Sequence, residues 1–192
     1  WNFLFFTGYL KMKGQRIEKR NIYIEMAIPN EEIASIYEQS IKEWFDQKIA
    51  NVDRSSLIKA FEEGDCEAAE NFISQQLMDT ISYFDYAESY YHGFLTGLLK
   101  NAGRYMVQSN RESGTGRPDI ILKTQAIRRG QVIILELKAA GSVAEMAAKC
   151  DEGLAQIEAQ QYAKPFLAEG YPRVSKYAIA FYKKECMVKK AE

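Results

Sequence analysis

One apolar segment, Gln131–Lys138, restricts the fold of this chain more than any other part of its sequence. It is rich in β-branched residues and lies between Gly130 and the small residues Ala139-Ala140-Gly141, a pattern typical of a buried strand. Glu136 and Lys138 interrupt the apolar run, and because they are two residues apart their side chains leave the same face. An acid and a base on a buried strand are costly unless they pair or bind something. The segment therefore predicts a sheet with a polar site at one strand end.

A second short strand, Asp119–Lys123, opens with an acid and precedes a turn at Arg128-Arg129-Gly130. If the two strands pair antiparallel about this turn, Asp119 lies close to the Glu136 end of its neighbour. The hairpin would then bring two carboxylates and the ammonium group of Lys138 to one point.

Such a group of side chains suits a divalent metal ion, because Mg²⁺ takes oxygen ligands and usually one or two carboxylates. A lysine beside the ion can orient or deprotonate the attacking water, or neutralise charge that builds on a phosphate. The alternative is a surface hairpin in which Glu136 and Lys138 form a salt bridge. The acid that opens the neighbouring strand favours the functional interpretation.

The same residues carry a resemblance. Pro118-Asp119 followed by Glu136-Leu137-Lys138 resembles the motif of the PD-(D/E)XK nuclease superfamily. More narrowly, the chain resembles the nuclease domain at the C-terminus of a bacterial family of ATPase-like proteins, over residues 86–182. The four matching elements, in chain order, are Glu88, Gly116-Arg117-Pro118-Asp119, Glu136-Leu137-Lys138, and Gln156-Ile157 with Tyr162.

The resemblance implies a metal-dependent nuclease that hydrolyses phosphodiester bonds. It does not settle which nucleic acid is cut, and we expect DNA ahead of RNA. It implies Mg²⁺ as cofactor, with Mn²⁺ able to substitute. The implied metal ligands are Asp119, Glu136, the Leu137 carbonyl and Glu88. The implied catalytic residues are Asp119, Glu136, Lys138, Glu88 and Gln156, and the implied substrate-binding residues are Arg117, Tyr162 and Gln160.

Several of these assignments have a structural alternative. Glu88 opens a helix, where an acid is favourable without any ligand. Gln160 and Gln161 are equally compatible with a solvated helix face. For the whole chain, the alternative is a nuclease-fold module that binds nucleic acid or protein within a larger ATPase-like protein but does not cleave.

The net charge of the 192-residue chain is −1, so no global basic field points to nucleic acid. This balance argues mildly against a nuclease, although basic residues can cluster locally. The candidates for such a cluster are Arg104, Arg111, Arg117, Arg128 and Arg129.

Cysteine and histidine usage excludes other site types. The three cysteines are widely spaced and fit reduced thiols in a cytoplasmic protein better than a disulfide framework or a zinc site. His92 is the only histidine, which excludes histidine-based metal sites and a Ser-His-Asp triad. We expect His92 to have a structural or supporting role.

The order of elements predicts an α/β protein. We expect a helix opening at Asp85 and ending before Gly103, strands at 105–109, 119–124 and 131–138, a helix at 143–163 capped by a Ser142–Glu145 capping box, and a strand at 174–182. This is the α-β-β-β-α-β core of the restriction-endonuclease-like fold. Ahead of it, Asn30, Ser55 and Asp65 begin helices to about residues 49, 61 and 82.

The expected domains are an N-terminal strand hairpin at 1–29, a small helical unit at 30–82, and the nuclease-like domain at 83–192. In the hairpin, strands at 3–12 and 20–28 flank a turn at 13–15. The start at Trp1 suggests a piece of a longer protein. In the family that the chain resembles, a W-x-x-x-x-x-T-G-Y-L segment marks the joint between the ATPase-like part and the nuclease part, so the resemblance implies an N-terminal ATPase-like domain that is absent here. The opening apolar run is too short to span a membrane. It, or an unpaired edge strand, could support a dimer.

Overall fold

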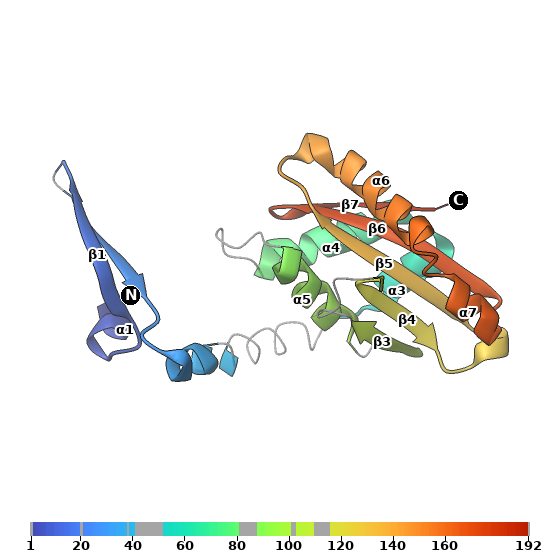
Figure 1. Ribbon diagram of the computed structural model, residues 1–192, viewed down its shortest axis with the longest axis horizontal. Helices are drawn as coiled ribbons and strands as arrows, with labels where there is room; N and C mark the ends of the chain where they lie inside the picture. Colours follow the sequence, from blue (N-terminus) through green and yellow to red (C-terminus); the bar gives the residue numbers. More distant parts are fainter. Residues whose placement is uncertain are drawn as a thin grey trace. The chain divides into compact units, whose positions relative to one another are not determined.

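The computed structural model describes residues 2–19, 21–37, 39–40, 52–80, 88–100, 103–109 and 116–191. The chain divides into two compact units, Trp1–Asn51 and Val52–Glu192 (Figure 1). Among the described residues, no helix is both long and apolar enough to cross a membrane.

The first unit contains a short helix, α1 (Asn2–Phe6), and an antiparallel two-stranded sheet of β1 (Lys11–Glu18) and β2 (Asn21–Ala27). The hairpin prediction is confirmed, but two of its details are wrong. The apolar start is helical rather than a strand, and Gly14 lies inside β1 beside a register shift instead of in the turn. Glycine is tolerated in a strand at such an irregularity.

Asn30 caps a helix as predicted, since its Oδ1 accepts the Ile33 N–H at 2.9 Å. Residues 31–37 and 39–40 are helical. The rest of the helix predicted to residue 49 lies outside the described residues.

The second unit is built on a five-stranded sheet in the order β3-β4-β5-β6-β7. Only β5 and β6 are parallel, and the other neighbours pair antiparallel. The strands are β3 (Tyr105–Ser109), β4 (Ile120–Thr124), β5 (Gln131–Ala139), β6 (Arg173–Tyr182) and β7 (Glu185–Lys190). The helices are α3 (Ser55–Glu63), α4 (Cys66–Thr80), α5 (Glu88–Leu99), the 3₁₀ turn η1 (Ile127–Arg129), α6 (Val143–Ala159) and α7 (Lys164–Glu169).

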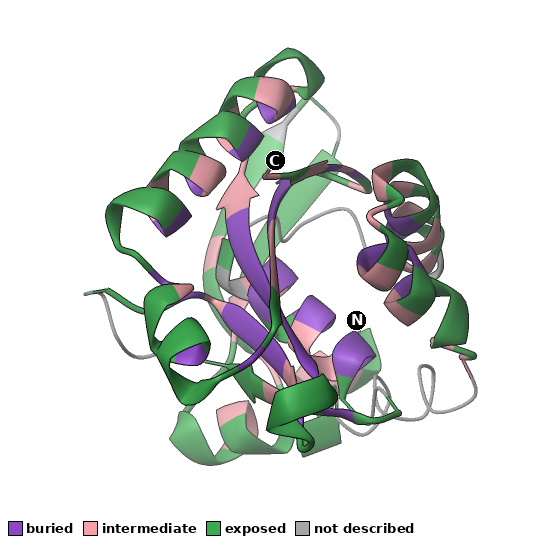
Figure 2. Cartoon of the chain, turned by 90° about the vertical axis from the view of Figure 1, so that its right-hand side faces the viewer, coloured by how far each residue is buried: buried purple, intermediate pink, exposed green. Residues whose placement is uncertain are grey.

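Helices cover both faces of this sheet, so its central strands are buried (Figures 1 and 2). On one face, Val132 and Ile134 of β5 form a buried cluster with Ile157 of α6 and Phe166 of α7. Small residues of β6, Ala178 among them, underlie the first half of α6. The predicted α-β-β-β-α-β order is therefore confirmed.

Helices α3 and α5 pack on the other face through aromatic contacts. Phe61 of α3 meets Tyr177 of β6 edge to face, with ring centroids 5.1 Å apart. Tyr91 of α5 stacks on Phe181 of β6 at 4.5 Å. Aromatic pairs of this kind add about 0.5–1.5 kcal/mol beyond the burial of their surface.

Helix α4 also closes one edge of the sheet. The Glu70 carboxylate accepts the Val188 N–H of β7 at 2.7 Å, and the Ser74 hydroxyl accepts the Cys186 N–H at 3.3 Å. The predicted helical unit at 30–82 is therefore divided: residues 52–80 belong to the compact unit of the sheet, and the boundary between units lies at residues 51 and 52.

Three further details differ from the prediction. Strand β7 was not expected, because Lys183-Lys184 reads as the end of β6, whereas Lys183 adopts φ +55° and turns the chain back. The helix predicted to residue 163 ends at Ala159, and Gln161, with φ +54°, separates it from α7.

The predicted capping box at Ser142 has different bonds. The Ser142 side chain makes no bond to a helix N–H among the described residues and instead donates to the Glu145 carboxylate at 3.1 Å. The same carboxylate accepts the Gly141 N–H at 3.1 Å, so it holds the strand-to-helix turn.

Candidate active site

The hairpin of β4 and β5 brings the predicted acids together. Ile120 pairs with Leu135, so Asp119 lies at the end of β4 opposite Glu136. The Asp119 Oδ2 accepts the Leu137 N–H at 2.8 Å, which fixes this carboxylate beside β5. The spacing argument from sequence, which placed Asp119 near Glu136, is confirmed.

Glu136 and Lys138 lie on the face of β5 that α6 covers. The Lys138 ammonium donates to Glu136 Oε1 at 3.0 Å and to Gln156 Oε1 of α6 at 2.8 Å. The Glu136 side chain is only 2% exposed and the Lys138 side chain 13%. The other Glu136 oxygen, Oε2, is buried and has no hydrogen-bond partner among the described residues. A buried carboxylate oxygen without a partner is costly, and it marks a place where a cation would fit.

The surroundings of Glu136 disfavour its charged form. Burial, followed by the nearby charge of Asp119, raises its pKa from an ordinary value of 4.5 to about 7, although the bond from Lys138 acts in the opposite direction. Glu88 adds a smaller effect with the same sign as Asp119. Near neutral pH this carboxyl group is therefore poised between its protonated and ionised forms.

Lys138 remains a cation in this arrangement. Burial favours its neutral form, but the bond to Glu136 and the negative charges around it outweigh burial and raise its pKa. A lysine with a raised pKa holds its proton at neutral pH. Of the three roles considered from sequence, orienting water and neutralising charge on a phosphate fit this state, and deprotonating water does not.

Close packing of α6 against the sheet positions these groups. A Cβ atom on Gly153 would lie 2.9 Å from the Ala178 Cβ and 3.5 Å from the Glu136 Cγ. A larger residue at position 153 would push α6 away from β5, and Gln156 lies one turn further along this helix. Sequence analysis missed Gly153, because a glycine inside a helix signals close approach only once its neighbours are known.

His92 supports the site from α5, as expected. It is buried, and its Nε2 bonds the Asp119 backbone carbonyl at 3.1 Å and the Ser109 hydroxyl at 3.2 Å. Because a carbonyl oxygen only accepts, this nitrogen carries the proton. The contact ties the start of β4 to α5 and β3, and it holds the backbone of Asp119.

Glu88, predicted as a third acid, is the exposed first residue of α5. Within the described part of the chain, no three His, Cys, Asp or Glu side chains are grouped closely enough to hold a metal ion. Asp119 and Glu136 thus form a pair, to which Glu88 contributes its charge through space. The Leu137 backbone is bound to Asp119 through its N–H group.

The three predicted substrate-binding residues line one cleft of about 660 Å³. Arg117 and Gln160 are exposed there, and Tyr162 is buried in the wall. The Tyr162 hydroxyl accepts a hydrogen bond from Gln156 Nε2 at 3.4 Å. The cleft is therefore separated from Lys138 by two side chains.

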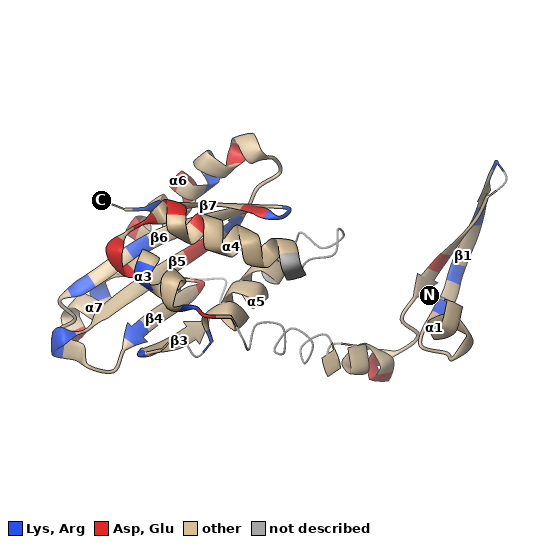
Figure 3. Cartoon of the chain, turned by 180° about the vertical axis from the view of Figure 1, so that it is seen from behind, with Lys and Arg blue, Asp and Glu red and all other residues tan. Residues whose placement is uncertain are grey.

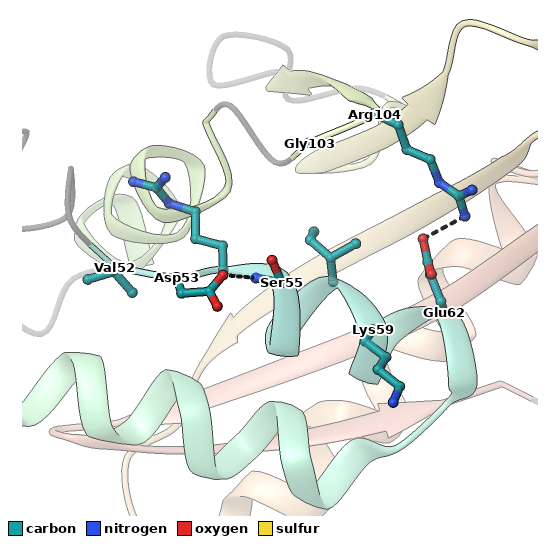
Figure 4. Close-up of a pocket in the computed structure, with 9 residues that line it drawn as sticks. Val52, Asp53, Ser55, Lys59, Glu62, Gly103 and Arg104 are labelled. Carbon is teal, nitrogen blue, oxygen red and sulfur yellow. Dashed lines mark hydrogen bonds and ion pairs between the residues drawn. The ribbon is translucent and has the colours of Figure 1, made fainter.

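A second cleft, of about 490 Å³, lies at the start of α3 beside Gly103 and Arg104 (Figure 4). Arg104 is paired with Glu62 at 2.8 Å, and Asp53 accepts the Ser55 N–H at 2.9 Å. These contacts account for the structure of this region, so we assign no chemistry to it.

The predicted basic residues are spread over the second unit rather than gathered at the site. Arg104 pairs with Glu62, Arg117 lines the first cleft, and Arg128 and Arg129 lie in η1. Arg111 lies outside the described residues. Figure 3 shows acidic segments on α3 and α4 and basic segments toward α7 and the neighbouring strand ends.

Comparison with known proteins agrees with this geometry. No curated protein matches the chain. A sequence model described as the PD-(D/E)XK nuclease superfamily matches residues 86–191, more than half of the chain and the whole of the segment that carries the site. The mixed α/β architecture is that of the restriction-endonuclease-like fold, and the chain belongs to the PD-(D/E)XK nuclease superfamily.

Proposed function

We propose that this chain is a metal-dependent nuclease that hydrolyses phosphodiester bonds in DNA at the site formed by Asp119, Glu136 and Lys138. The observation that carries the proposal is the buried Glu136 carboxylate, whose Oε2 has no partner among the described residues and which lies opposite Asp119 on the neighbouring strand. A purely structural Glu–Lys pair does not require a second acid beside it, and that acid makes the site less stable in the absence of a cation.

The donor set fits Mg²⁺, with Mn²⁺ as a substitute, since two carboxylates are the usual protein contribution to such a site. Asp119 and Glu136 would hold the ion, with the Leu137 carbonyl and Glu88 as further candidates. When bound, the ion supplies Lewis-acid stabilisation of charge on the phosphate.

The chain's own groups would then act as follows. The Lys138 ammonium, held by Glu136 and Gln156, orients the attacking water and neutralises charge on the phosphate. Gln156 fixes the direction of this ammonium. Arg117, Gln160 and Tyr162 in the adjoining cleft contact the substrate strand.

Local charge supports a nucleic-acid substrate despite the net charge of −1. Exposed basic residues occur where η1, α7 and β6 begin or end, at the end of the sheet where β5 begins, whereas Glu136 and Lys138 lie toward the other end of this strand (Figure 3). These exposed basic residues are Arg128, Arg129, Lys164 and Arg173. Contacts of this kind make binding to DNA weaker as the salt concentration rises.

The proposal extends to the context of the chain. The hairpin at 1–29 would connect to an N-terminal ATPase-like domain, and a dimer is compatible with the exposed apolar residues of β1 and β2. The three cysteines are free, which is consistent with a cytoplasmic location.

Calorimetric titration of Mn²⁺, run beside a cleavage assay on DNA and RNA, tests the proposal. We expect binding and cleavage in the wild-type chain and neither in Asp119→Ala. The matched control is Asp151→Ala, which removes an exposed acid of α6 that pairs with Lys189. Full cleavage by Asp119→Ala would refute the assignment.

One observation favours a second candidate, a nuclease-fold module that binds without cleaving. Among the described residues the site offers two clustered acids rather than three. Nucleic-acid binding without metal-dependent cleavage, in both the wild-type chain and Asp119→Ala, would support this candidate.

A further inference from the structure

The cleft beside the candidate active site has a composition that the proposed hydrolysis does not explain. It lies between β3 and β4 on one side and the junction of α6 with α7 on the other. Its lining residues are Gln108, Ser109, Gly116, Arg117, Pro118, Ile121, Gln160, Gln161, Tyr162, Pro165 and Phe166. Its volume of about 660 Å³ lies in the range of sites that enclose a single small ligand.

Neutral amides dominate the polar part of this lining among the described residues. Gln108, Gln160 and Gln161 are all exposed, and Arg117 is the only charged side chain that the described part of the chain contributes to the cleft. A groove that follows a phosphate backbone needs several lysines or arginines. Glutamine instead offers a donor and an acceptor together, which matches the edge of a nucleobase and that of adenine in particular.

The apolar part of the lining comes from Pro118, Ile121, Tyr162, Pro165 and Phe166. Pro118 and Ile121 are buried between the strands and the helices, and Phe166 packs with Ile121 and Tyr162 in one cluster. A flat apolar ring seated on this surface would have amides at its edge. This combination suits a base rather than a sugar or a phosphate.

The geometry of the cleft walls is fixed by the backbone. Gln161 has φ +54° and ends α6, and Gly116 has φ +77° in the entry to β4. A Cβ atom on Gly116 would lie 3.5 Å from the Gln160 Oε1, so the two walls approach each other here. The amide of Gln160 therefore lies beside the Gly116 backbone.

Hydrogen bonds also connect the wall of the cleft to the candidate active site. Tyr162 lines it, and its hydroxyl accepts from Gln156, whose carbonyl oxygen accepts from Lys138. A nucleotide whose base occupied the cleft would carry its phosphate toward Lys138.

We infer that this cleft binds one unpaired nucleobase of the substrate strand, adenine in preference to the others, next to the phosphate that is cleaved. The inference rests on the proposed function and specifies its substrate class. A base inside a duplex is stacked and paired, so it cannot enter such a cleft without leaving the helix. The enzyme therefore prefers single-stranded DNA, or DNA with an unpaired segment, to continuous duplex.

Fluorescence anisotropy with labelled oligonucleotides in EDTA tests the inference without cleavage. Three single-stranded probes of equal length and phosphate charge, oligo-dA, oligo-dT and an abasic strand, are compared with a duplex of the same length. We expect the wild-type chain to bind oligo-dA on the order of tenfold more tightly than the abasic strand or the duplex. The Gln108→Ala/Gln160→Ala double variant should lose this preference, because its affinity for oligo-dA falls to that for the abasic strand.

The control is Gln125→Ala, an exposed glutamine at the far end of β4 that is not among the residues lining this cleft. It should bind all four probes as the wild-type chain does. Equal wild-type affinity for oligo-dA and the abasic strand would overturn the inference, as would an unchanged preference in the double variant. Because binding is measured in EDTA, failure of the proposed hydrolysis would appear separately, as a base preference without cleavage when Mn²⁺ is added.

Discussion

The nine residues of β5 alternate between two faces of the sheet, one mainly apolar and one that ends in charged residues. Ile133, Leu135 and Leu137 are fully buried and face the side of the sheet that α5 covers. The opposite face, which α6 covers, begins with Val132 and Ile134 and ends with Glu136 and Lys138. The apolar face stabilises the fold by burying apolar surface, whereas the buried acid on the other face lowers the stability of the fold. The comparison teaches that fold and candidate site share one strand but can be perturbed separately.

The largest expected effect is on the polar face. Asp119→Asn keeps an oxygen that can accept the Leu137 N–H but removes the negative charge. We expect cleavage to fall by on the order of a thousandfold, with Mn²⁺ binding lost. Thermal unfolding should remain within a few degrees of the wild-type value. A large loss of thermal stability would mean that this acid is structural, and the separation of the two faces would fail.

On the apolar face, Leu135→Ala should have the reverse outcome. Leu135 is fully buried, so its truncation should lower the free energy of unfolding by about 3 kcal/mol. Urea denaturation measures this loss. The cleavage rate per folded molecule should change little at a temperature where the variant is folded. A cleavage rate per folded molecule that falls as far as it does in Asp119→Asn would show that the two faces are coupled.

Glu136→Gln sharpens the comparison through pH. The folded-state pKa of Glu136, about 7, lies above its ordinary value of 4.5, so its contribution to stability is fully present below pH 4.5 and is lost as pH rises through 7. Metal-free wild-type protein should lose on the order of 3 kcal/mol from this group between those limits. The variant should lack this loss. Urea denaturation in EDTA at pH 5 and pH 8 measures it, and equal pH dependence in both proteins would contradict the assignment.

Gly153→Ala tests how tightly α6 must approach the polar face. The added Cβ would meet Ala178 at 2.9 Å, an overpacking that costs about 1–3 kcal/mol before the better helix propensity of alanine offsets part of it. We expect a lower midpoint in urea together with slower cleavage, since Gln156 moves with the helix. Ala155→Gly, at an exposed position of the same helix, is the matched control and should slow cleavage less.

The smallest expected effect is that of Tyr162→Phe. The hydroxyl lost accepts a single long bond, 3.4 Å from Gln156 Nε2. Cleavage should fall about two- to fivefold, in line with a loss of roughly 0.5–1 kcal/mol. The affinity for Mn²⁺ should not change, and altered Mn²⁺ binding would place Tyr162 nearer the acids than the hydrogen bonds indicate.

The sequence was most informative where local pattern and long-range geometry coincide. The hairpin register that sets Asp119 opposite Glu136 follows from strand alternation and a short turn, and it was predictable. The bond from Lys138 to Gln156 joins residues 18 positions apart, and only the family resemblance pointed to Gln156.

Other features depend on contacts that no local pattern encodes. Lys183 and Gln161 adopt positive φ, which is uncommon for residues other than glycine, so strand β7 and the break between α6 and α7 were missed. The helix α1 was mistaken for a strand because a short aromatic run has no diagnostic period. The need for Gly153 becomes visible only when α6 lies on β6.

The closure of β7 by α4 has a consequence for association between chains. An exposed strand edge presents free N–H groups on which another chain can add a strand, a common route to aggregation. At β7 the N–H groups of Cys186 and Val188 are already taken by side chains of α4. The opposite border of the sheet is β3, which bonds only to β4 among the described strands. We therefore expect a strand of another chain to add at β3 and not at β7. Because β3 carries Gln108, the added strand would lie next to the proposed base cleft.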